Sequence, residues 1–370
     1  MTAPHPAGVP GIDVPRLAAW LSRALPDADR LGGIELIAGG RSNLTYRIDL
    51  ASGRRVVVRR PPLGHVLPTA HDMAREHRVL SALAGSAVPV PRPLAMCADE
   101  DVIGAPFYVM EYVEGRVLRT VDDAADVTAG QAAALSRQLV DVLADIHLLD
   151  VEAAGLADFG RPEGYMARQL RRWGKQWESS HAAHLSAMGD GTGDAGLPEY
   201  DRLFSRLAER LPERPPGRGG TLVHGDFRLD NALVRLTPEP AISAVVDWEM
   251  STLGDPLADL GLTLVYWTEP EDTERLSIPV GSTVTAAPGF ITGREVAERY
   301  AARTGFDLAG LDFYVAFGCF KLAVVLEGIH ARFLQHATVG DGFDQVGESV
   351  PILVERAHRI LDAGTPWPAP

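Results

Sequence analysis

The octapeptide at 224–231, His-Gly-Asp-Phe-Arg-Leu-Asp-Asn, constrains this chain most, together with Asp247, which follows its last residue by sixteen positions. Apolar, largely β-branched residues at 221–223 lead into the octapeptide, and apolar character resumes at 232–234. After a turn with two prolines comes a third apolar run, 241–246, which ends at the aspartate. The pattern therefore predicts strand, loop, strand, turn and strand, with polar side chains at the strand ends.

The spacing of Asp226, Asn231 and Asp247 is typical of phosphoryl transfer as kinases perform it. In that chemistry one carboxylate accepts the proton of the attacking hydroxyl, while an amide and a second carboxylate hold magnesium on the nucleotide phosphates. Either half of the pattern alone is also ordinary turn chemistry. Both halves in this order indicate the reaction class, but they do not name the substrate.

With these residues the chain resembles the aminoglycoside phosphotransferase (phosphotransferase enzyme) family of the protein-kinase-like superfamily, which phosphorylates small molecules. The resemblance implies an α+β, protein-kinase-like bilobal fold, with a small β-rich N-terminal lobe and a larger, mainly helical C-terminal lobe. It implies that Asp226 is the catalytic base, that Asn231 and Asp247 are magnesium ligands, and that His224 is a buried organiser of the loop. Arg228 either offsets charge that develops in the transition state or is a solvated loop residue.

The N-terminal lobe is expected to bind the nucleotide. Strands are predicted at 34–38 and 44–48, and the polar loop between them is expected to cover the phosphates with its backbone N–H groups. The candidate nucleotide-binding residues of this loop are Gly39, Gly40, Ser42 and Asn43.

The run 54–60 predicts the third strand, at whose end kinases place a lysine that pairs with the phosphates and with a glutamate on the following helix. This chain has arginine there, and the strand alternation favours Arg59 over Arg60. A helix predicted from about residue 70 to residue 83 supplies Glu76 as the partner, which is otherwise a solvent-exposed helix charge. Which arginine contacts phosphate stays open, because arginine is longer than lysine and forked.

Residues 107–115 resemble the strand and hinge between the two lobes, where adenine recognition would use backbone groups of Glu111 and Val113. The predicted domains are therefore 1–114, the nucleotide-binding lobe with a leading helix, and 115–370, the lobe with the catalytic loop and acceptor pocket.

A basic, aromatic helix that starts near Gly164 is a local anomaly in an acidic chain of 35 Lys plus Arg against 49 Asp plus Glu. It carries the candidate acceptor-binding residues Arg168, Arg171, Arg172 and Trp173, and its arginines suit a phosphorylated or carboxylated ligand. The alternative is a surface helix that balances local acidity. This segment and residues 251–259 resemble the phosphotransferase domains found fused to, or encoded with, acyl-CoA dehydrogenase-like enzymes.

Several other helices follow from cap signals and apolar spacing. An alanine- and leucine-rich helix is predicted at 130–149, with His147 near its end as a structural residue. Asp255 followed by proline predicts a capped helix start, Thr292 with glutamate three residues later predicts a capping box, and 313–334 predicts a long buried helix.

The net charge of −14 argues against a nucleic-acid binder, and two cysteines point to a reducing compartment. The first ten residues lack the features of a signal peptide, and the most apolar stretch, 313–329, is broken by Lys321 and Glu327. We therefore expect a cytoplasmic protein that does not bind membranes. The sequence does not indicate an oligomeric state.

The sequence predicts an ATP- and Mg²⁺-dependent phosphotransferase that moves the γ-phosphoryl group to a hydroxyl of a small molecule. A hydroxyacyl-CoA and an aminoglycoside- or macrolide-type compound are both compatible acceptors, and GTP is open as the donor. The alternative is a nucleotide-binding pseudokinase that regulates or scaffolds a partner, for which the arginine at position 59 is the one sequence sign.

Overall fold

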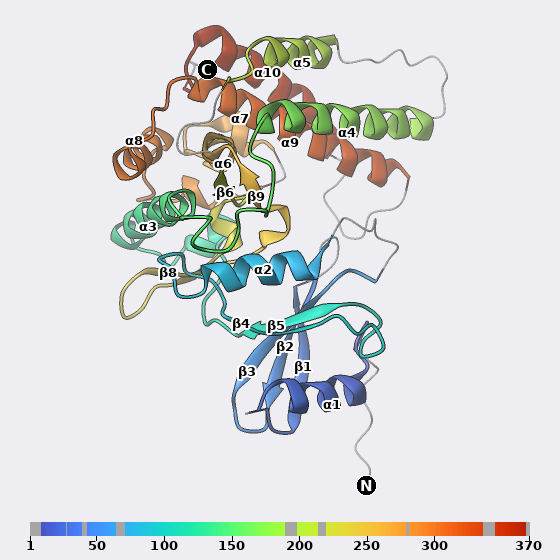
Figure 1. Ribbon diagram of the computed structural model, residues 1–370. Coiled ribbons are helices and arrows are strands. Elements are labelled where there is room, and N and C mark those ends of the chain that lie inside the picture. The colour runs from blue at the N-terminus through green and yellow to red at the C-terminus, as the bar shows by residue number, and fades with distance from the viewer. Residues whose placement is uncertain are drawn as a thin grey trace. The chain divides into compact units, whose positions relative to one another are not determined.

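A computed structural model describes residues 9–26, 28–38, 43–63, 71–188, 198–213, 220–278, 281–335 and 345–367. The chain divides into two compact units (Figure 1). The first unit comprises residues 1–115 and 243–251, and the second comprises residues 116–242 and 252–370. Residues 243–251 belong to the first unit although the segments on both sides of them belong to the second, so Asp247 lies in the first unit. The octapeptide lies in the second unit.

The first unit is built on a five-stranded antiparallel sheet with the strand order β1-β2-β3-β5-β4. The strands are β1 (Leu31–Ala38), β2 (Leu44–Leu50), β3 (Arg55–Arg60), β4 (Pro93–Cys97) and β5 (Phe107–Glu111). The three N-terminal strands confirm the strand predictions, although β1 begins three residues earlier than its apolar run suggested.

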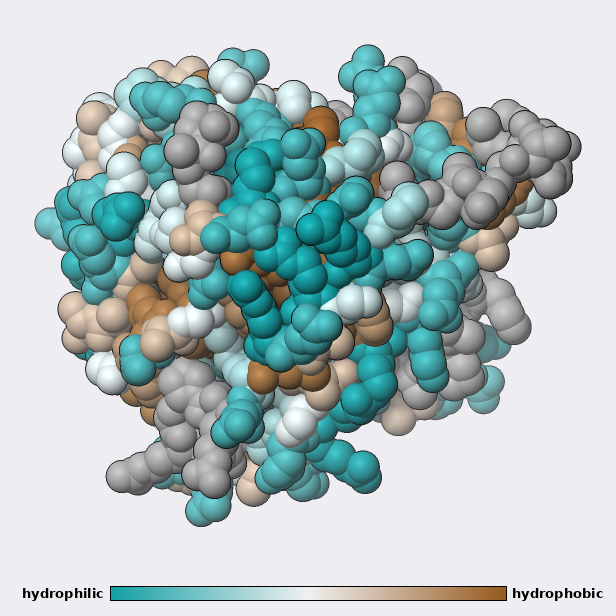
Figure 2. Space-filling view, turned by 90° about the horizontal axis from the view of Figure 1, so that it is seen from above, coloured by the Kyte–Doolittle hydropathy of each residue, from teal (hydrophilic) through white to brown (hydrophobic). Residues whose placement is uncertain are grey.

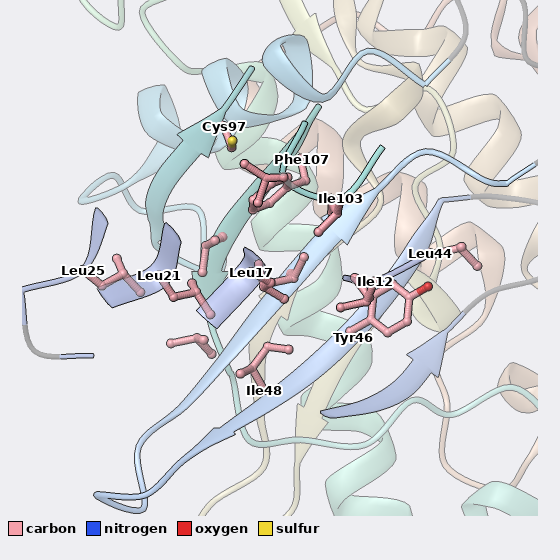
Figure 3. Close-up of a cluster of buried hydrophobic side chains, with 14 of the residues drawn as sticks. Ile12, Leu17, Leu21, Leu25, Leu44, Tyr46, Ile48, Cys97, Ile103 and Phe107 are labelled. Carbon is pink, nitrogen blue, oxygen red and sulfur yellow. The ribbon is translucent and has the colours of Figure 1, made fainter. Parts of the chain in front are cut away.

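Helix α1 (Val14–Ala24) covers one face of this sheet. The Asp13 carboxylate caps it by accepting the Arg16 N–H at 3.0 Å. Its residues Leu17 and Leu21 belong to one buried cluster with Tyr46 and Ile48 of β2 (Figure 3). An apolar stripe at helical spacing thus meets the apolar side of an alternating strand.

Helix α2 (Met73–Leu83) belongs to the other face of the sheet. It begins at Met73 rather than at about residue 70, because Asp72 is its N-cap and accepts the Arg75 N–H. On β3, Val56 and Val58 join the cluster under α1, so strand alternation turns the side chains between and after them toward α2.

The second unit is mainly helical, and α9 (Leu311–Leu334) is at its centre. It packs against α4 (Tyr165–Met188), α6 (Pro256–Tyr266) and α10 (Ser349–Ala363). The other helices of the unit are α3 (Ala129–His147), α5 (Pro198–Glu209), α7 (Thr273–Leu276) and α8 (Gly293–Thr304). The caps predicted at Asp255 and Thr292 are both confirmed.

The octapeptide follows β6 (Thr221–Val223), which pairs with β9 (Thr252–Gly254). It ends in a short 3₁₀ turn before β7 (Ala232–Arg235), which pairs with β8 (Ala241–Val245). The predicted strands around the loop are thus present.

Helix α9 is long and apolar enough to cross a membrane, with a mean hydropathy of 1.5 over its most apolar window. However, 83% of that window is buried inside the protein, as in the core helix of a globular unit. The face seen in Figure 2 is mostly hydrophilic, and hydrophobic residues show on it only in small areas.

Candidate functional site

The octapeptide brings Asp226 and Asn231 into direct contact in the second unit. Asn231 Nδ2 donates to the backbone oxygen of Asp226 at 2.8 Å and to its carboxylate Oδ2 at 3.1 Å. Phe227 is fully buried beneath the loop, and the ring of buried His224 accepts the Asp226 N–H through Nδ1 at 3.3 Å. The loop is therefore held from below while the Asp226 carboxylate remains partly exposed.

Asp259 on α6 fixes the start of this loop, a contact that sequence reasoning missed. Its two carboxylate oxygens accept the backbone N–H groups of His224 at 2.6 Å and Gly225 at 2.8 Å. Burial alone would raise the pKa of Asp259, but the hydrogen bond and charge of His147 and the charge of His224 bring that pKa below its ordinary value. His147, predicted to be structural, lies between this carboxylate and the Tyr300 hydroxyl.

Arg228 lies against the octapeptide and is only partly exposed to solvent. Its Nε is 3.5 Å from Asp226 Oδ2, and its Nη1 is 3.4 Å from Asp230 Oδ2. The guanidinium sits 4.7 Å from the ring centre of Tyr266, a cation–π geometry. Burial raises the pKa of Asp230, and the positive charge of Arg228 opposes that rise.

Lys321 on α9 reaches the same loop. Its Nζ donates to the backbone oxygen of Gly225 at 2.7 Å and lies 5.2 Å from the ring centre of Trp173. Burial lowers the pKa of Lys321, while the charges of Asp226 and Asp259 oppose this shift. The sequence shows Lys321 as a lysine within an apolar helix. That feature served only as a reason against a membrane span, and no role in the site was predicted for it.

The basic segment of α4 lines an open depression of about 490 Å³. Its lining residues are Arg168, Arg171, Arg172, Lys175 and Gln176.

The arginines of this segment differ in their contacts. Arg168 donates to the backbone oxygens of Arg161 and Glu163, so it closes the turn before its own helix. Arg172 lies over the ring of Trp173, 5.6 Å from the ring centre. The indole N–H of Trp173 is buried and has no hydrogen-bond partner among the described residues.

In the first unit, Arg59 is held between two carboxylates. Its Nε donates to Glu76 Oε2 at 2.8 Å, and its Nη2 donates to Asp247 Oδ1 at 2.6 Å. Glu76 also accepts the hydroxyl of Tyr108 at 2.9 Å and Nδ2 of Asn43 at 2.6 Å. Burial disfavours the Arg59 charge, but Glu76, Tyr108 and Asp247 outweigh it and raise the pKa of Arg59.

Arg60 lies on the opposite face of the sheet. Its guanidinium donates to the backbone oxygens of Gly11 and Ile103, next to α1. Arg59 is therefore the arginine that pairs with Glu76, and Glu76 is buried rather than a solvent-exposed helix charge.

Asp247 occupies the left-handed region of the backbone, with φ 68° and ψ 57°. A non-glycine residue rarely adopts this conformation, and such residues concentrate at functional sites. The neighbouring Glu249 is 3.2 Å from Asn43 Nδ2, and Asn43 Oδ1 is buried without a partner among the described residues. The first unit thus presents carboxylates and one unsatisfied amide oxygen on a single face of its sheet.

Each unit by itself offers oxygen donors of the kind that magnesium prefers, carboxylates above all. Asp247 and Glu249 supply carboxylates in the first unit, and Asn231 supplies an amide in the second.

The remaining nucleotide candidates are less informative. Gly39, Gly40 and Ser42 lie outside the described residues. The N–H of Glu111 already donates to Arg92 O, and its side chain pairs with the Arg92 guanidinium at 2.5 Å. Adenine recognition by the Glu111 backbone would therefore use its carbonyl oxygen rather than its N–H, and the prediction for Glu111 and Val113 stays a prediction.

Comparison with known proteins adds the family. Residues 33–314 match the Phosphotransferase enzyme family. The chain belongs to this family. The match confirms the resemblance inferred from the octapeptide, and it identifies the chain as a phosphotransferase enzyme with the protein-kinase-like α+β fold.

The curated relatives carry this region within longer proteins. The chain is 35% identical over 354 residues to acyl-CoA dehydrogenase family member 11 of Rattus norvegicus, an alignment that covers 94% of the chain and 43% of the relative. It is 35% identical over 320 residues to acyl-CoA dehydrogenase family member 10 of Mus musculus, covering 86% of the chain and 28% of the relative. The chain thus spans less than half the length of these relatives.

Solved structures show the same fold. A putative aminoglycoside phosphotransferase from Ralstonia eutropha superposes with a TM-score of 0.77 at 31% identity, covering 95% of this chain and 98% of the other. An amicoumacin kinase in complex with AMP-PNP, Ca²⁺ and Ami superposes with a TM-score of 0.59 at 14% identity, covering 96% of each chain.

Proposed function

We propose that this phosphotransferase moves the γ-phosphoryl group of ATP to a hydroxyl of a small-molecule acceptor. The observation that carries the proposal is the contact of Asn231 with Asp226, which pairs the candidate base with a candidate metal ligand in one loop. Support also comes from relatives of the same fold that are named as kinases of small molecules.

In this proposal Asp226 accepts the proton of the acceptor hydroxyl as its oxygen attacks phosphorus. The carboxylate is suited to this role because it is partly exposed while its backbone is fixed by the His224 ring and the Asn231 amide. Arg228, close to Asp226 and stacked on Tyr266, is placed to offset negative charge that develops during transfer.

Asp247 and Asn231 are the proposed ligands of Mg²⁺, with Glu249 as a further oxygen donor. When bound, the metal would neutralise charge on the phosphates. Arg59, positioned by Glu76, would contact phosphate in the role that lysine has in kinases.

For the acceptor we propose an anionic compound of the hydroxyacyl-CoA class. The α4 depression brings together Arg171, Arg172 and Lys175, and guanidinium groups bind phosphates in a fork geometry. Lys321 links the same helix to the octapeptide, since it contacts both Trp173 of α4 and Gly225. The names of the curated relatives are consistent with an acyl-CoA substrate.

The test is an ADP-release assay with purified protein, ATP and Mg²⁺ on three acceptor sets: hydroxyacyl-CoAs, aminoglycosides and macrolides. We expect turnover with the first set, confirmed by mass spectrometry of the phosphorylated product. Asp226→Asn should lower kcat by about 100-fold or more at nearly unchanged ATP affinity. Wild-type turnover in this variant would refute the assignment of the base, and turnover confined to aminoglycosides would refute the acceptor class.

A second candidate is a nucleotide-binding pseudokinase that regulates or scaffolds a partner. The observation in its favour is that Arg59, in place of lysine, bonds directly to Asp247. This reading predicts that the protein binds ATP but phosphorylates no acceptor, and that Arg59→Lys likewise forms no product.

A cytoplasmic location of the protein remains a prediction as well.

A further inference from the structure

A histidine- and glutamate-rich cluster lies between α4 and α9, apart from the residues assigned to phosphoryl transfer. It consists of His181 and His184 on α4 with Glu327 on α9. The Nδ1 atoms of the two histidines lie 2.9 Å and 2.8 Å from the same oxygen, Oε1 of Glu327. One atom from each of the three residues lies within 4.8 Å of the others, close enough for a single ion.

The spacing of these residues in the sequence places their side chains close together. His181 and His184 are three residues apart on α4, so they share a helix face. Glu327 and His330 have the same spacing on α9, and the rings of His184 and His330 are 4.8 Å apart. His330 Nδ1 is buried without a hydrogen-bond partner among the described residues, which leaves a fourth nitrogen beside the cluster.

The helix backbones approach closely at this place. A side chain added at Gly328 would meet the Ser180 hydroxyl at 3.2 Å, so α9 runs tight against α4 next to Glu327. One added at Gly347 would lie 2.8 Å from the His330 ring, so that ring is also closely covered. The cluster thus lies at a close contact of two helices, with Glu327 buried and the two histidines partly exposed.

The charge balance of the cluster favours a cation. Glu327 is only 3% exposed, and within the part of the chain that the structure describes no lysine or arginine pairs with it. A buried carboxylate is costly unless its charge is offset. Neutral imidazoles donate hydrogen bonds but leave the negative charge in place, whereas a divalent cation would offset it.

We propose that His181, His184 and Glu327 bind one Zn²⁺ ion, with His330 as a candidate fourth ligand. Two imidazoles and a carboxylate are a zinc-type donor set, and imidazole nitrogen selects against Mg²⁺. Zinc bonds of about 2.0–2.1 Å place tetrahedral ligand atoms about 3.3 Å apart, so each Nδ1–Oε1 distance would lengthen by about half an ångström. The ligand atoms, which lie within 4.8 Å of one another, would need to approach by at most about 1.5 Å.

The ion would fix the register of two helices that carry acceptor-side residues. Trp173 precedes His181 by eight positions on α4, or about 12 Å of helix, and Lys321 precedes Glu327 by six positions on α9, or about 9 Å. We therefore assign the ion a structural role, independent of the proposed phosphoryl transfer.

The experiment uses full-length protein without a polyhistidine tag, freed of metal by a chelator and titrated with ZnCl₂ against a chromophoric zinc chelator. We expect one Zn²⁺ per chain, a rise in the melting temperature on addition of Zn²⁺, and neither effect with MgCl₂. His184→Ala should weaken zinc binding by at least about 100-fold, more than the loss of an outer-shell contact. His77→Ala, which removes an imidazole in the first unit, is the matched control and should bind Zn²⁺ as the wild type does.

Glu327→Gln separates the metal site from a purely hydrogen-bonded cluster. The amide keeps an oxygen that accepts an imidazole N–H but is a poor zinc ligand, so this variant should fold and lose the zinc-dependent rise in melting temperature. If either variant fails to fold, visible absorption bands of the Co²⁺-loaded wild type report nitrogen and oxygen ligation directly. Absence of one-to-one binding in the wild type, or wild-type affinity in His184→Ala, would overturn the proposal.

Discussion

The ion pair between Arg59 and Glu76 gives the sharpest test of how the first unit is stabilised. The Arg59 side chain is 10% exposed and that of Glu76 is 2% exposed, so both charges lie in the protein interior. Arg59→Met removes the positive charge and leaves the Glu76 carboxylate buried with only Tyr108 and Asn43 as donors. Breaking such a buried pair costs about 3–5 kcal/mol, and the two remaining donors favour the lower end of that range.

The double variant Arg59→Met/Glu76→Gln should recover part of this loss. Its neutral amide can still bond to Tyr108 and Asn43 but carries no charge to desolvate, so we expect it to be about 1–3 kcal/mol more stable than Arg59→Met alone. Arg47→Met is the matched control on the same sheet. Arg47 forms more exposed ion pairs with Glu35 and Asp49, so its loss should destabilise the fold much less than Arg59→Met does.

The pH dependence of Arg59→Met has a definite sign. Burial already raises the pKa of Glu76 in the wild type, and the Arg59 charge opposes that rise, so removing Arg59 raises the pKa further. A carboxyl group whose folded-state pKa is raised stabilises the fold below its unfolded pKa and loses that contribution as pH rises through the folded value. The loss of unfolding free energy in the variant, relative to the wild type, should therefore be smallest near pH 5 and grow toward pH 8.

The assay is urea unfolding of the four proteins at several pH values, followed by tryptophan fluorescence and circular dichroism. A loss below about 1 kcal/mol in Arg59→Met at pH 7.5, with an unchanged urea slope, would refute the claim that this pair is buried and coupled.

Three further outcomes follow from the site. Asp247→Ala should abolish Mg²⁺-dependent nucleotide binding while the circular dichroism spectrum stays that of the wild type, and binding that persists at limiting Mg²⁺ would contradict its assignment. Lys321→Met removes a charged hydrogen bond worth about 1.5–3 kcal/mol, so kcat should fall by about 10- to 100-fold with no change in the ATP dissociation constant. Arg171→Glu/Arg172→Glu should raise KM for a hydroxyacyl-CoA at least tenfold and leave KM for ATP unchanged, and an equal effect on both constants would point to a structural role for α4.

Much of this arrangement could be predicted from the sequence because short-range patterns carry it. Alternation along β3 separates Arg59 from Arg60, since Val56 and Val58 belong to the buried side. Caps were equally local, and Asp255 shows this by accepting the Leu257 N–H two residues on. Asp226 and Asn231 are close together in the sequence, within the octapeptide, so their contact could be expected from that short separation.

The sequence did not predict groups that reach the loop from distant helices. Asp259 lies 35 residues beyond His224 and Lys321 lies 96 residues beyond Gly225, yet each bonds to the backbone of the octapeptide. The local pattern identifies Asp255, which precedes a proline, as a helix cap, but it gives no sign of a role for Asp259. Only the packing of α6 against the octapeptide shows that Asp259 holds the loop.

These long-range contacts share a physical property that sequence reading can use. Asp259, Lys321 and Glu327 are each charged residues within apolar helices, and each is engaged by a polar partner, with Asp259 and Glu327 buried and Lys321 partly buried. A charge that interrupts an apolar face is costly unless it is paired, so its persistence in a core helix requires a compensating group. In the sequence, Lys321 and Glu327 served only to exclude a membrane span. For the reason just given, they were also the best indications of the proposed acceptor side and of the proposed zinc site.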